Sequence, residues 1–501
     1  MFQAANEAWT RKKFQEGIEL LERASRLDPA NASILLGLGN WYGCRYNYAA
    51  AEQCFEKAER VAVHKAHALA AAGVYCGDFG NYALSERFFL RALEQKDVTP
   101  RILAQLATLY ERQRRLDEAA AMVERALRMD GDHTLALTVK ARLERQTGKI
   151  EAAEQTIRSF VTQPNPDAWV HAQAWYELGL ILDRQGEYDK AMMAFMSAKL
   201  LLTPHAERLL YELEIIRQRN RVLRENLRTE TVQRWLDSAP SLPPPRRLAF
   251  LGGHPRSGTT LLEQVLDSHP DIISLEETEI FRDDAYMPLA HRLPEDTPVL
   301  SVLESSPLDA LQHARSSYFR SAELLLGRPV GDRLLMDKNP ALSFLIPLLV
   351  RIFPEIKLLI VLRDPRDVIL SCFMQPIPLI TGSATYLALG RTVDEYVALM
   401  SLWQKLKPML EGRYLEVRYE DMVEDLDSVA RKTLDFLGLP WDECVLGFDK
   451  HARQKVVRSP TYADVTQPIY KRAKGRWQHY QRYLEPYLPK LEPFVKAFGY
   501  E

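Results

Sequence analysis

The first half of the chain repeats itself with a period of 34 residues. Segments that begin at Ala32, Ala66, Pro100 and Thr134 align without gaps. In all four segments the eighth and twentieth residues are small, and the twenty-fourth is apolar. Small residues allow two antiparallel helices to approach closely, and larger apolar residues fill the space to the next pair. A period of this length therefore predicts a stack of helical hairpins.

The repeated pattern resembles the tetratricopeptide repeat. This resemblance implies an N-terminal α-solenoid over residues 1–203 with about six repeats, the first of them incomplete over Met1 to Asn31. The missing opening of that first copy leaves the completeness of the N-terminus undecided. The sixth copy begins late, near Ala172. Residues 204–245 are expected to form a capping helix and a proline-rich linker.

A solenoid of this kind presents a concave groove along its repeats. We expect this groove to bind an acceptor protein, an acceptor peptide or another partner protein. A purely structural or dimerising role is the alternative, because a fold alone does not give a function. The oligomeric state is left open, with a dimer as one of the alternatives.

The charge balance and the cysteines limit what the chain binds and where it works. Lys and Arg number 65 against 67 Asp and Glu, so no global attraction to nucleic acid or to an anionic membrane is expected. The five cysteines are unclustered and form no CxxC pair, which predicts a reducing compartment and argues against a disulfide framework and a zinc site. No apolar run is long enough for a signal peptide or a membrane span. We therefore expect a cytoplasmic protein.

The stretch from Leu248 to His269 predicts a phosphate site. A short apolar strand, Leu248–Leu251, leads into a glycine-rich turn and then into residues with helical spacing. In such a unit the backbone N–H groups of the loop and the helix dipole converge on an anion. Gly253 and Gly258 have the GxxxxG spacing of a nucleoside triphosphatase loop, but Thr259 follows where that loop has its lysine. A kinase or another nucleoside triphosphatase is therefore disfavoured.

Charged side chains also stand at the ends of three further predicted strands. Glu277 closes a short strand that begins at Asp271, and Lys338 lies between an apolar approach and a helix. Arg363 follows the apolar run Lys357–Leu362, and Ser371 lies two helical turns further on. Because ligands bind beyond the carboxyl ends of strands in open α/β sheets, we expect two anion pockets about a nucleotide apart on a parallel sheet. A ligand with phosphates at both ends has that shape, and ATP does not.

Four motifs together resemble the sulfotransferase family: HPRSGTT, the RDPRD element with Ser371, Tyr419-Glu420-Asp421 and Gly475-Arg476-Trp477. The similarity runs from about Arg247 to Tyr480. The EET and KNP motifs within it are similar to those of tyrosylprotein sulfotransferases, and the whole arrangement resembles bacterial proteins that join tetratricopeptide repeats to a sulfotransferase domain. This resemblance implies a P-loop-like α/β domain with a central parallel sheet over residues 246–501. It also implies 3′-phosphoadenosine 5′-phosphosulfate as the co-substrate, with no metal.

The resemblance implies a role for each matching residue. The 5′-phosphosulfate is bound by Arg256, Ser257, Gly258, Thr259 and Thr260. The 3′-phosphate is bound by Arg363 and Ser371, the adenine lies near Tyr419, and a late loop closes over the nucleotide with Lys474, Gly475 and Arg476. The catalytic residues are Glu277 as the base, Lys338 and Arg256 beside the bridging oxygen, and Thr461 at the position of a serine.

These residues predict the transfer of a sulfuryl group to an acceptor hydroxyl, with a protein or peptide tyrosine as the leading acceptor. One residue departs from the family pattern, since Glu279 stands where the tyrosine-modifying enzymes have an arginine implicated in gripping an acidic peptide. A carbohydrate or small-molecule hydroxyl is the alternative acceptor. A non-catalytic scaffold with repeats and a nucleotide-binding domain is the alternative from another class of protein.

Overall fold

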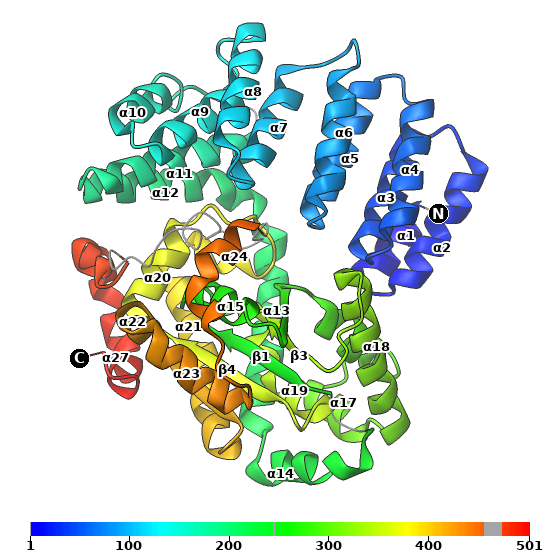
Figure 1. Ribbon diagram of the computed structural model, residues 1–501, viewed down its shortest axis with the longest axis vertical. Helices are drawn as coiled ribbons and strands as arrows, with labels where there is room; N and C mark the ends of the chain where they lie inside the picture. The colour runs from blue at the N-terminus through cyan, green and yellow to red at the C-terminus, as the bar shows by residue number, and fades with distance from the viewer. Residues whose placement is uncertain (1, 166, 244–245, 455–472, 501) are drawn as a thin grey trace. The chain divides into compact units, whose positions relative to one another are not determined.

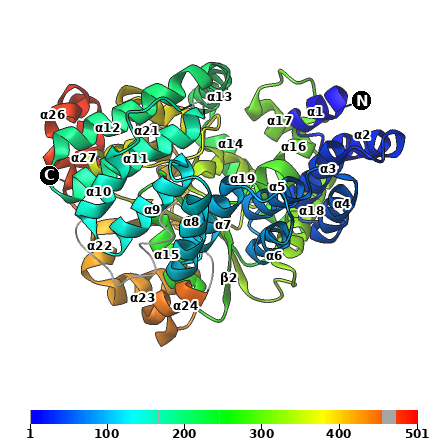
Figure 2. The same ribbon diagram turned by 90° about the horizontal axis from the view of Figure 1, so that it is seen from above.

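A computed structural model describes residues 2–165, 167–243, 246–454 and 473–500 of the chain (Figures 1 and 2). The chain divides into two compact units, Met1–Gln185 and Gly186–Glu501. We call them the repeat unit and the sheet unit and describe each by itself. The sixth repeat spans the division between them, and the domain boundaries expected from the sequence, at residues 203 and 245, stay predictions.

The repeat unit consists of helices that pack in pairs along the chain. They are α1 (Phe2–Thr10), α2 (Phe14–Leu27), α3 (Ala32–Cys44), α4 (Tyr48–Val61), α5 (Lys65–Asp78), α6 (Tyr82–Leu93), α7 (Pro100–Arg112), α8 (Leu116–Met129), α9 (Thr134–Gln146), α10 (Ile150–Arg158) and α11 (Ala168–Arg184). The first helices of the hairpins α3–α4, α7–α8 and α9–α10 begin at the residues that the 34-residue period predicts, and α5 begins one residue early. The prediction of N-terminal tetratricopeptide repeats is confirmed.

The small residues of the repeat allow the two helices of a hairpin to touch. A Cβ atom at Gly39 would overlap the ring of Phe55, and one at Gly73 would lie 2.8 Å from the ring of Phe89. Both rings are buried. Each glycine at the eighth position of a repeat therefore makes room for the aromatic side chain at the twenty-fourth.

Buried charges in the repeat unit lie next to charges of opposite sign. Glu177 on α11 is 2% exposed and pairs with Arg145 and Arg142 on α9. The Nη1 of Arg142 also lies 3.6 Å from the carboxylate of Glu111 on α7. Although burial alone raises the pKa of Glu177, the two guanidinium groups hold it below its ordinary value. The carboxylate therefore stays charged inside the stack.

The sheet unit is built around five parallel strands (Figure 1). They are β1 (Leu248–Gly253), β2 (Ile272–Glu276), β3 (Leu334–Lys338), β4 (Lys357–Leu362) and β5 (Tyr414–Arg418). Their order is β2-β3-β1-β4-β5, so β1 lies in the middle with β3 on one side and β4 on the other. The predicted α/β domain with a central parallel sheet is confirmed.

Helices cover both faces of this sheet. The helices that the described residues of the unit form are α12 (Tyr188–Leu202), α13 (Glu207–Asn226), α14 (Thr229–Asp237), α15 (Thr259–Asp267), α16 (Met287–Ala290), α17 (Val299–Ser305), α18 (Leu308–Leu326), α19 (Ile346–Ile352), α20 (Pro365–Met374), α21 (Leu389–Leu406), α22 (Tyr419–Glu424), α23 (Leu426–Leu437), α24 (Phe448–Gln454), α26 (Gln481–Leu484) and α27 (Leu488–Ala497). Apolar residues of α15, α22 and α23 pack on the face that carries Met336. Tyr318 of α18 lies on the opposite face, where its hydroxyl donates to Asp337. Within the described residues, no helix has the length and apolar character needed to cross a bilayer.

Candidate active site

A cavity of about 370 Å³ lies in the sheet unit, where the strands end. Every strand is followed by a residue that lines it: Arg256 after β1, Glu277 after β2, Asn339 after β3, Arg363 after β4 and Tyr419 after β5. The carboxyl ends of parallel strands meet at one edge of a sheet, which brings together residues that are far apart in the sequence. This edge is the candidate site.

The loop after β1 has a backbone that only glycine allows at two positions. Gly253 has a φ of 126°, and a Cβ atom there would overlap the carbonyl oxygen of Val361 on β4. Gly258 has a φ of 102°, and a Cβ atom there would lie 2.6 Å from the ring of Tyr419. The helix α15 begins at the next residue, Thr259. The glycines therefore form a tight cradle at a helix N-terminus, which is a site for an anion.

Two arginines join the phosphate loop to α20. The Nε of Arg256 donates to the hydroxyl of Ser371 over 3.2 Å. Arg363 donates to the carbonyl oxygen of Arg256 over 3.1 Å, and its guanidinium group lies 4.8 Å from the ring centre of Tyr419. The sequence predicted two anion pockets about a nucleotide apart. The structure places Arg256 and Ser371 in contact on the wall of one cavity, and the two anion pockets stay a prediction.

The donors of this wall suit a phosphorylated ligand. The Nε of Arg363 is buried and finds no hydrogen-bond acceptor among the described residues. A buried donor without an acceptor is costly, and a ligand oxygen would satisfy it. The glycine cradle and this arginine line the same cavity, so both face one ligand.

Lys338 lies under the cavity, among three carboxylates. Its ammonium group is 2.7 Å from Glu277, 3.2 Å from Glu263 and 4.0 Å from Glu276. The side chain of Lys338 is fully buried, whereas that of Glu277 is 34% exposed. Burial alone lowers the pKa of Lys338, but Glu263, Glu277 and Glu276 raise it above its ordinary value. The lysine is therefore a charged group at the foot of the site.

Glu277 has a backbone conformation that is unusual for its side chain. Its φ is 49°, in the left-handed region, and its N–H donates to the carbonyl oxygen of Lys338 over 2.7 Å. This bond continues the pairing of β2 with β3 by one residue, beyond the register pair Glu276–Lys338. The turn re-aims the side chain of Glu277 so that its carboxylate reaches the lysine and the cavity.

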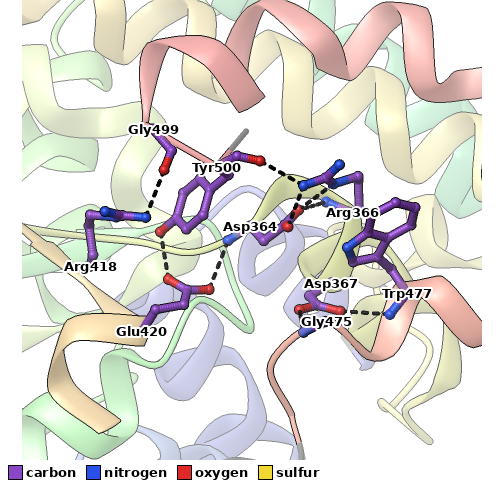
Figure 3. Close-up of polar contacts among 9 residues, drawn as sticks. All are labelled: Asp364, Arg366, Asp367, Arg418, Glu420, Gly475, Trp477, Gly499 and Tyr500. Atoms are coloured by element: carbon purple, nitrogen blue, oxygen red, sulfur yellow. Dashed lines mark hydrogen bonds and ion pairs between the residues drawn. The ribbon is translucent and has the colours of Figure 1, made fainter. Parts of the chain in front are cut away.

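The segment after Ala473 is fastened to the start of α20 (Figure 3). The carboxylate of Asp367 accepts the backbone N–H groups of Gly475 over 2.7 Å and of Trp477 over 2.8 Å. Arg363 donates to the carbonyl oxygen of Ala473 over 2.5 Å. The same element of the chain, residues 363–371, thus holds both the cavity wall and the late loop.

Tyr500 and Glu420 support this element from the other side (Figure 3). The hydroxyl of Tyr500 donates to Glu420 over 2.7 Å, and Glu420 accepts the backbone N–H of Asp364 over 3.2 Å. Arg366 donates to Asp364 and to the carbonyl oxygen of Tyr500. Its guanidinium group lies 4.1 Å from the ring centre of Trp477. These contacts fix the backbone between Arg363 and Asp367.

Most of the residues expected at the site line the cavity: Arg256, Gly258, Thr259, Thr260, Glu277, Arg363, Ser371, Tyr419 and Arg476. Ser257 and Lys338 are buried behind it, and Gly475 holds the late loop through Asp367. The ammonium group of Lys474 is instead paired with Glu424 on the surface. Thr461 lies outside the described residues. The roles of all these residues stay predictions.

Sequence reasoning missed three groups at the site. Glu263 is a buried carboxylate that contacts Lys338, and Asp367 is a buried carboxylate that binds the late loop. Neither residue lies in a sequence motif that indicates its partner. His254 lines the cavity, and burial lowers its pKa to about 4, so its imidazole is neutral at physiological pH. The available signal was that Glu263 stands between the apolar pairs Leu261–Leu262 and Val265–Leu266 on α15.

Comparisons with known proteins agree with this architecture. Residues 249–443 match the sulfotransferase family, residues 2–41 and 105–168 match one tetratricopeptide-repeat model, and residues 172–201 match another. An uncharacterized protein of Aquifex aeolicus is 26% identical over 68% of this chain and 44% of its own length. The protein-tyrosine sulfotransferase of Drosophila melanogaster is 25% identical over 46% of each chain. This chain therefore spans about half the length of these curated relatives.

Among solved structures, the sulfotransferase domain from the Synechococcus PCC 7002 olefin synthase is 24% identical over 47% of this chain, with a TM-score of 0.34. Among the described residues, no group of three or more His, Cys, Asp or Glu side chains is arranged to hold a metal ion. The family match covers β1 to β5, whose ends carry the cavity. The chain joins tetratricopeptide repeats to a domain of the sulfotransferase family that is similar to protein-tyrosine sulfotransferases.

Proposed function

We propose that this protein transfers the sulfuryl group of 3′-phosphoadenosine 5′-phosphosulfate to the hydroxyl of a protein or peptide tyrosine. In this proposal the repeats bind the acceptor or a partner protein. The relatives named protein-tyrosine sulfotransferases support the acceptor, and the repeat matches support the protein partner. The five free cysteines fit a reducing compartment, which supports a place in the cytoplasm.

The observation that carries the proposal is the pair of Glu277 and Lys338, whose side chains meet over 2.7 Å at the edge of the cavity. A phenol with a pKa near 10 is a weak nucleophile at neutral pH, so a carboxylate that takes its proton assists the attack. Glu277 is the group placed for this step. A bond forms between the phenol oxygen and sulfur, and the bond from sulfur to the 5′-phosphate oxygen breaks with its electrons on that oxygen.

Lys338 and Arg256 serve the oxygen on which this negative charge grows. Fixed cations aimed at a developing charge lower the barrier, most of all in a site that excludes water. The phosphate loop, with Ser257, Thr259 and Thr260, would hold the 5′ end of the nucleotide. Arg363 and Ser371 would hold the 3′-phosphate, with Tyr419 beside the adenine. The leaving group carries both phosphates, so this wall must bind anions at two points.

The segments that close the site complete the proposal. Gly475 and Arg476 belong to the late loop that Asp367 fastens, and the side chain of Arg476 lines the cavity. Lys474 is next to this loop, and in the proposal it turns from Glu424 toward the nucleotide. Thr461 would supply a catalytic hydroxyl at the position where the tyrosine-modifying enzymes have a serine.

A small-molecule hydroxyl is the second candidate acceptor, and Glu279 favours it. This residue replaces the arginine implicated in gripping an acidic peptide, and its carboxylate lies 3.1 Å from the guanidinium group of Arg282. Apolar side chains, among them Phe344, Ile380 and Leu399, also line the cavity. Such a wall suits an uncharged ring as well as a tyrosine side chain.

Calorimetric binding of adenosine 3′,5′-bisphosphate, with ATP and AMP as controls, tests the nucleotide part. Binding of the bisphosphate alone would support it, and Arg256→Ala should abolish that binding. Arg431→Ala is the control, because this exposed arginine on α23 pairs with Asp427 and does not line the cavity. Intact binding to Arg256→Ala would contradict the phosphate-loop assignment.

Transfer of labelled sulfate to a tyrosine peptide, a small phenol and a sugar then separates the acceptors. Labelled tyrosine in the peptide supports the leading proposal. Label only on the small phenol, or only on the sugar, supports the second candidate. A protein that binds the bisphosphate and labels none of the three acceptors contradicts the proposed activity and returns the scaffold alternative.

A further inference from the structure

We propose that Glu263 is the positioning residue that holds Lys338 in place while Glu277 is occupied with the acceptor. This inference rests on the proposed function, because it concerns the separate roles of Lys338 and Glu277 in the proposed transfer. Glu263 lies on α15, one helical turn after Thr259. It is not among the residues that line the cavity.

The two oxygens of the Glu263 carboxylate have separate partners. Oε2 lies 3.2 Å from the ammonium group of Lys338. Oε1 accepts the hydroxyl of Ser274 on β2 over 2.5 Å. The side chains of Glu263 and Lys338 are both fully buried. The serine thus fixes the orientation of a carboxylate whose other oxygen forms an ion pair with the lysine, without a hydrogen bond between them.

Glu277 has a different exposure and a different task. Its side chain is 34% exposed and lines the cavity, so an acceptor hydroxyl can reach it. When Glu277 takes the proton of that hydroxyl it becomes neutral and no longer balances the charge of Lys338. A buried ammonium group needs a remaining counter-ion, since an unpaired buried charge is strongly destabilising. Glu263 is fully buried and does not line the cavity, so the acceptor does not reach it.

The position of Glu263 also ties the lysine to the phosphate loop. The helix α15 follows this loop directly, beginning at Thr259. A lysine has a long flexible side chain, and a catalytic group must be held to within about 0.5 Å of its working position. The contact with Glu263 makes one rigid helix set the distance between Lys338 and the loop. Glu276, at 4.0 Å, adds negative charge without a hydrogen bond to the lysine.

The test compares Glu263→Gln and Glu263→Asp with the unsubstituted full-length protein. We expect Glu263→Gln to keep its affinity for adenosine 3′,5′-bisphosphate and to lose about 10- to 100-fold in kcat, the size of effect seen when a supporting contact behind a functional group is removed. The pKa of Lys338 should fall, because the described charges that face it are the carboxylates of Glu263, Glu276 and Glu277. The alkaline limb of the kcat–pH profile should therefore move to lower pH. Glu263→Asp should lose less activity and keep the profile.

Gln264→Leu is the matched control, since Gln264 is the next residue on α15, is equally buried and does not line the cavity. It should keep kcat and the profile. If it shifts the profile as Glu263→Gln does, the effect is a general disturbance of α15 and the proposal fails. An unchanged kcat and profile in Glu263→Gln would also overturn it. If Glu263→Gln does not fold, Ser274→Ala decides, with a loss of several-fold in kcat at unchanged bisphosphate affinity expected and full activity contradicting the proposal.

A second readout does not need an acceptor. The proton titration of Lys338 can be followed by NMR with ¹³Cε-labelled lysine, and Lys338→Met assigns the signal. A lower pKa in Glu263→Gln supports the contact even if no acceptor is ever modified, in which case only the proposed function fails. An unchanged pKa in an enzyme that does transfer sulfate leaves the function standing and removes Glu263 from its positioning role.

Discussion

Two glutamates, one in each unit, both contact a cation but have different surroundings. Glu177 in the repeat unit and Glu277 in the sheet unit both lie within hydrogen-bond distance of a cation. Glu177 is buried between two arginines, whereas Glu277 shares one lysine with two other carboxylates and is 34% exposed. The repeat unit gives this buried carboxylate two arginines, and the sheet unit gathers three carboxylates around one lysine beside a cavity.

The difference shows where interactions that lower the stability of the fold lie at the candidate site. A buried carboxylate with two guanidinium partners has nothing left to offer a ligand. A carboxylate that competes for one lysine gains from a partner that removes its charge, such as the proton of an acceptor hydroxyl. The left-handed backbone of Glu277, with a φ of 49°, is a second local cost at the same place. Unfavourable local features collect at functional sites because the surrounding fold holds them.

The largest expected effect is that of a substitution at Glu277, the glutamate of the sheet unit. We expect Glu277→Gln to lower kcat by about 10²- to 10⁴-fold, because an amide cannot take the proton of the acceptor. The affinity for adenosine 3′,5′-bisphosphate and the melting temperature should stay close to those of the parent protein. Turnover assays with calorimetry and thermal melting measure these quantities. A variant that keeps full turnover would remove Glu277 from the role of base.

The same substitution in the repeat unit should have the opposite result. We expect Glu177→Gln to destabilise the repeat unit by about 3–5 kcal/mol, the usual cost of removing one partner from a buried ion pair. The kcat of the remaining folded protein should not change. Denaturant unfolding followed by circular dichroism, with turnover measured in the same samples, checks both parts. A loss of kcat without a loss of stability would contradict the division of tasks between the two glutamates.

The sequence predicts the repeat unit well because its information is local. The small residues at Gly39 and Gly73 and their aromatic partners lie within one period, so the helices they join can be read from adjacent positions. The strand β4 and the helix after it could be found in the same way, since a run such as Lys357–Leu362 is apolar throughout. The confirmed parts of the prediction are of this kind.

The sequence could not give the contacts that define the candidate site, because they depend on how the strands pair. The order that puts β1 between β3 and β4 is set by packing across the whole unit. Glu277 meets Lys338 because the register aligns Glu276 with Lys338, and no motif contains that register. The contact between Arg256 and Ser371 was missed for the same reason, and the two pockets were expected apart. The role of a buried residue such as Glu263 can be inferred only when the residues that contact it in the fold are known.

A smaller effect on stability is expected in the repeat unit, where it tests the packing between the two helices of one repeat. We expect Gly39→Ala to destabilise the protein by about 1–3 kcal/mol, because its methyl group overlaps the ring of Phe55. The double variant Gly39→Ala with Phe55→Val should recover part of this loss, since the fourth repeat carries Ala107 and Val123 at the same two positions. A double-mutant cycle from denaturant unfolding measures the coupling. Strictly additive losses would mean that the two positions do not pack on each other.

The last prediction concerns an effect that builds up gradually with pH, and it compares buried acids in the two units. Burial raises the pKa of Asp337 to about 7, and Tyr318, which donates to it, only partly offsets this. The folded protein then holds a proton that the unfolded chain has released between about pH 4 and pH 7, so this residue's contribution to stability falls as pH rises through that window. The slope reaches about 1.4 kcal/mol per pH unit.

Asp337→Asn should remove this slope, because the amide still accepts the hydroxyl of Tyr318 and does not titrate. Glu177 has the opposite sign, since its pKa is held below the ordinary value and its contribution is lost as pH falls. Unfolding curves of both variants between pH 4 and pH 8 separate the two contributions. A slope that persists in Asp337→Asn would show that Asp337 is ionised in the folded sheet unit.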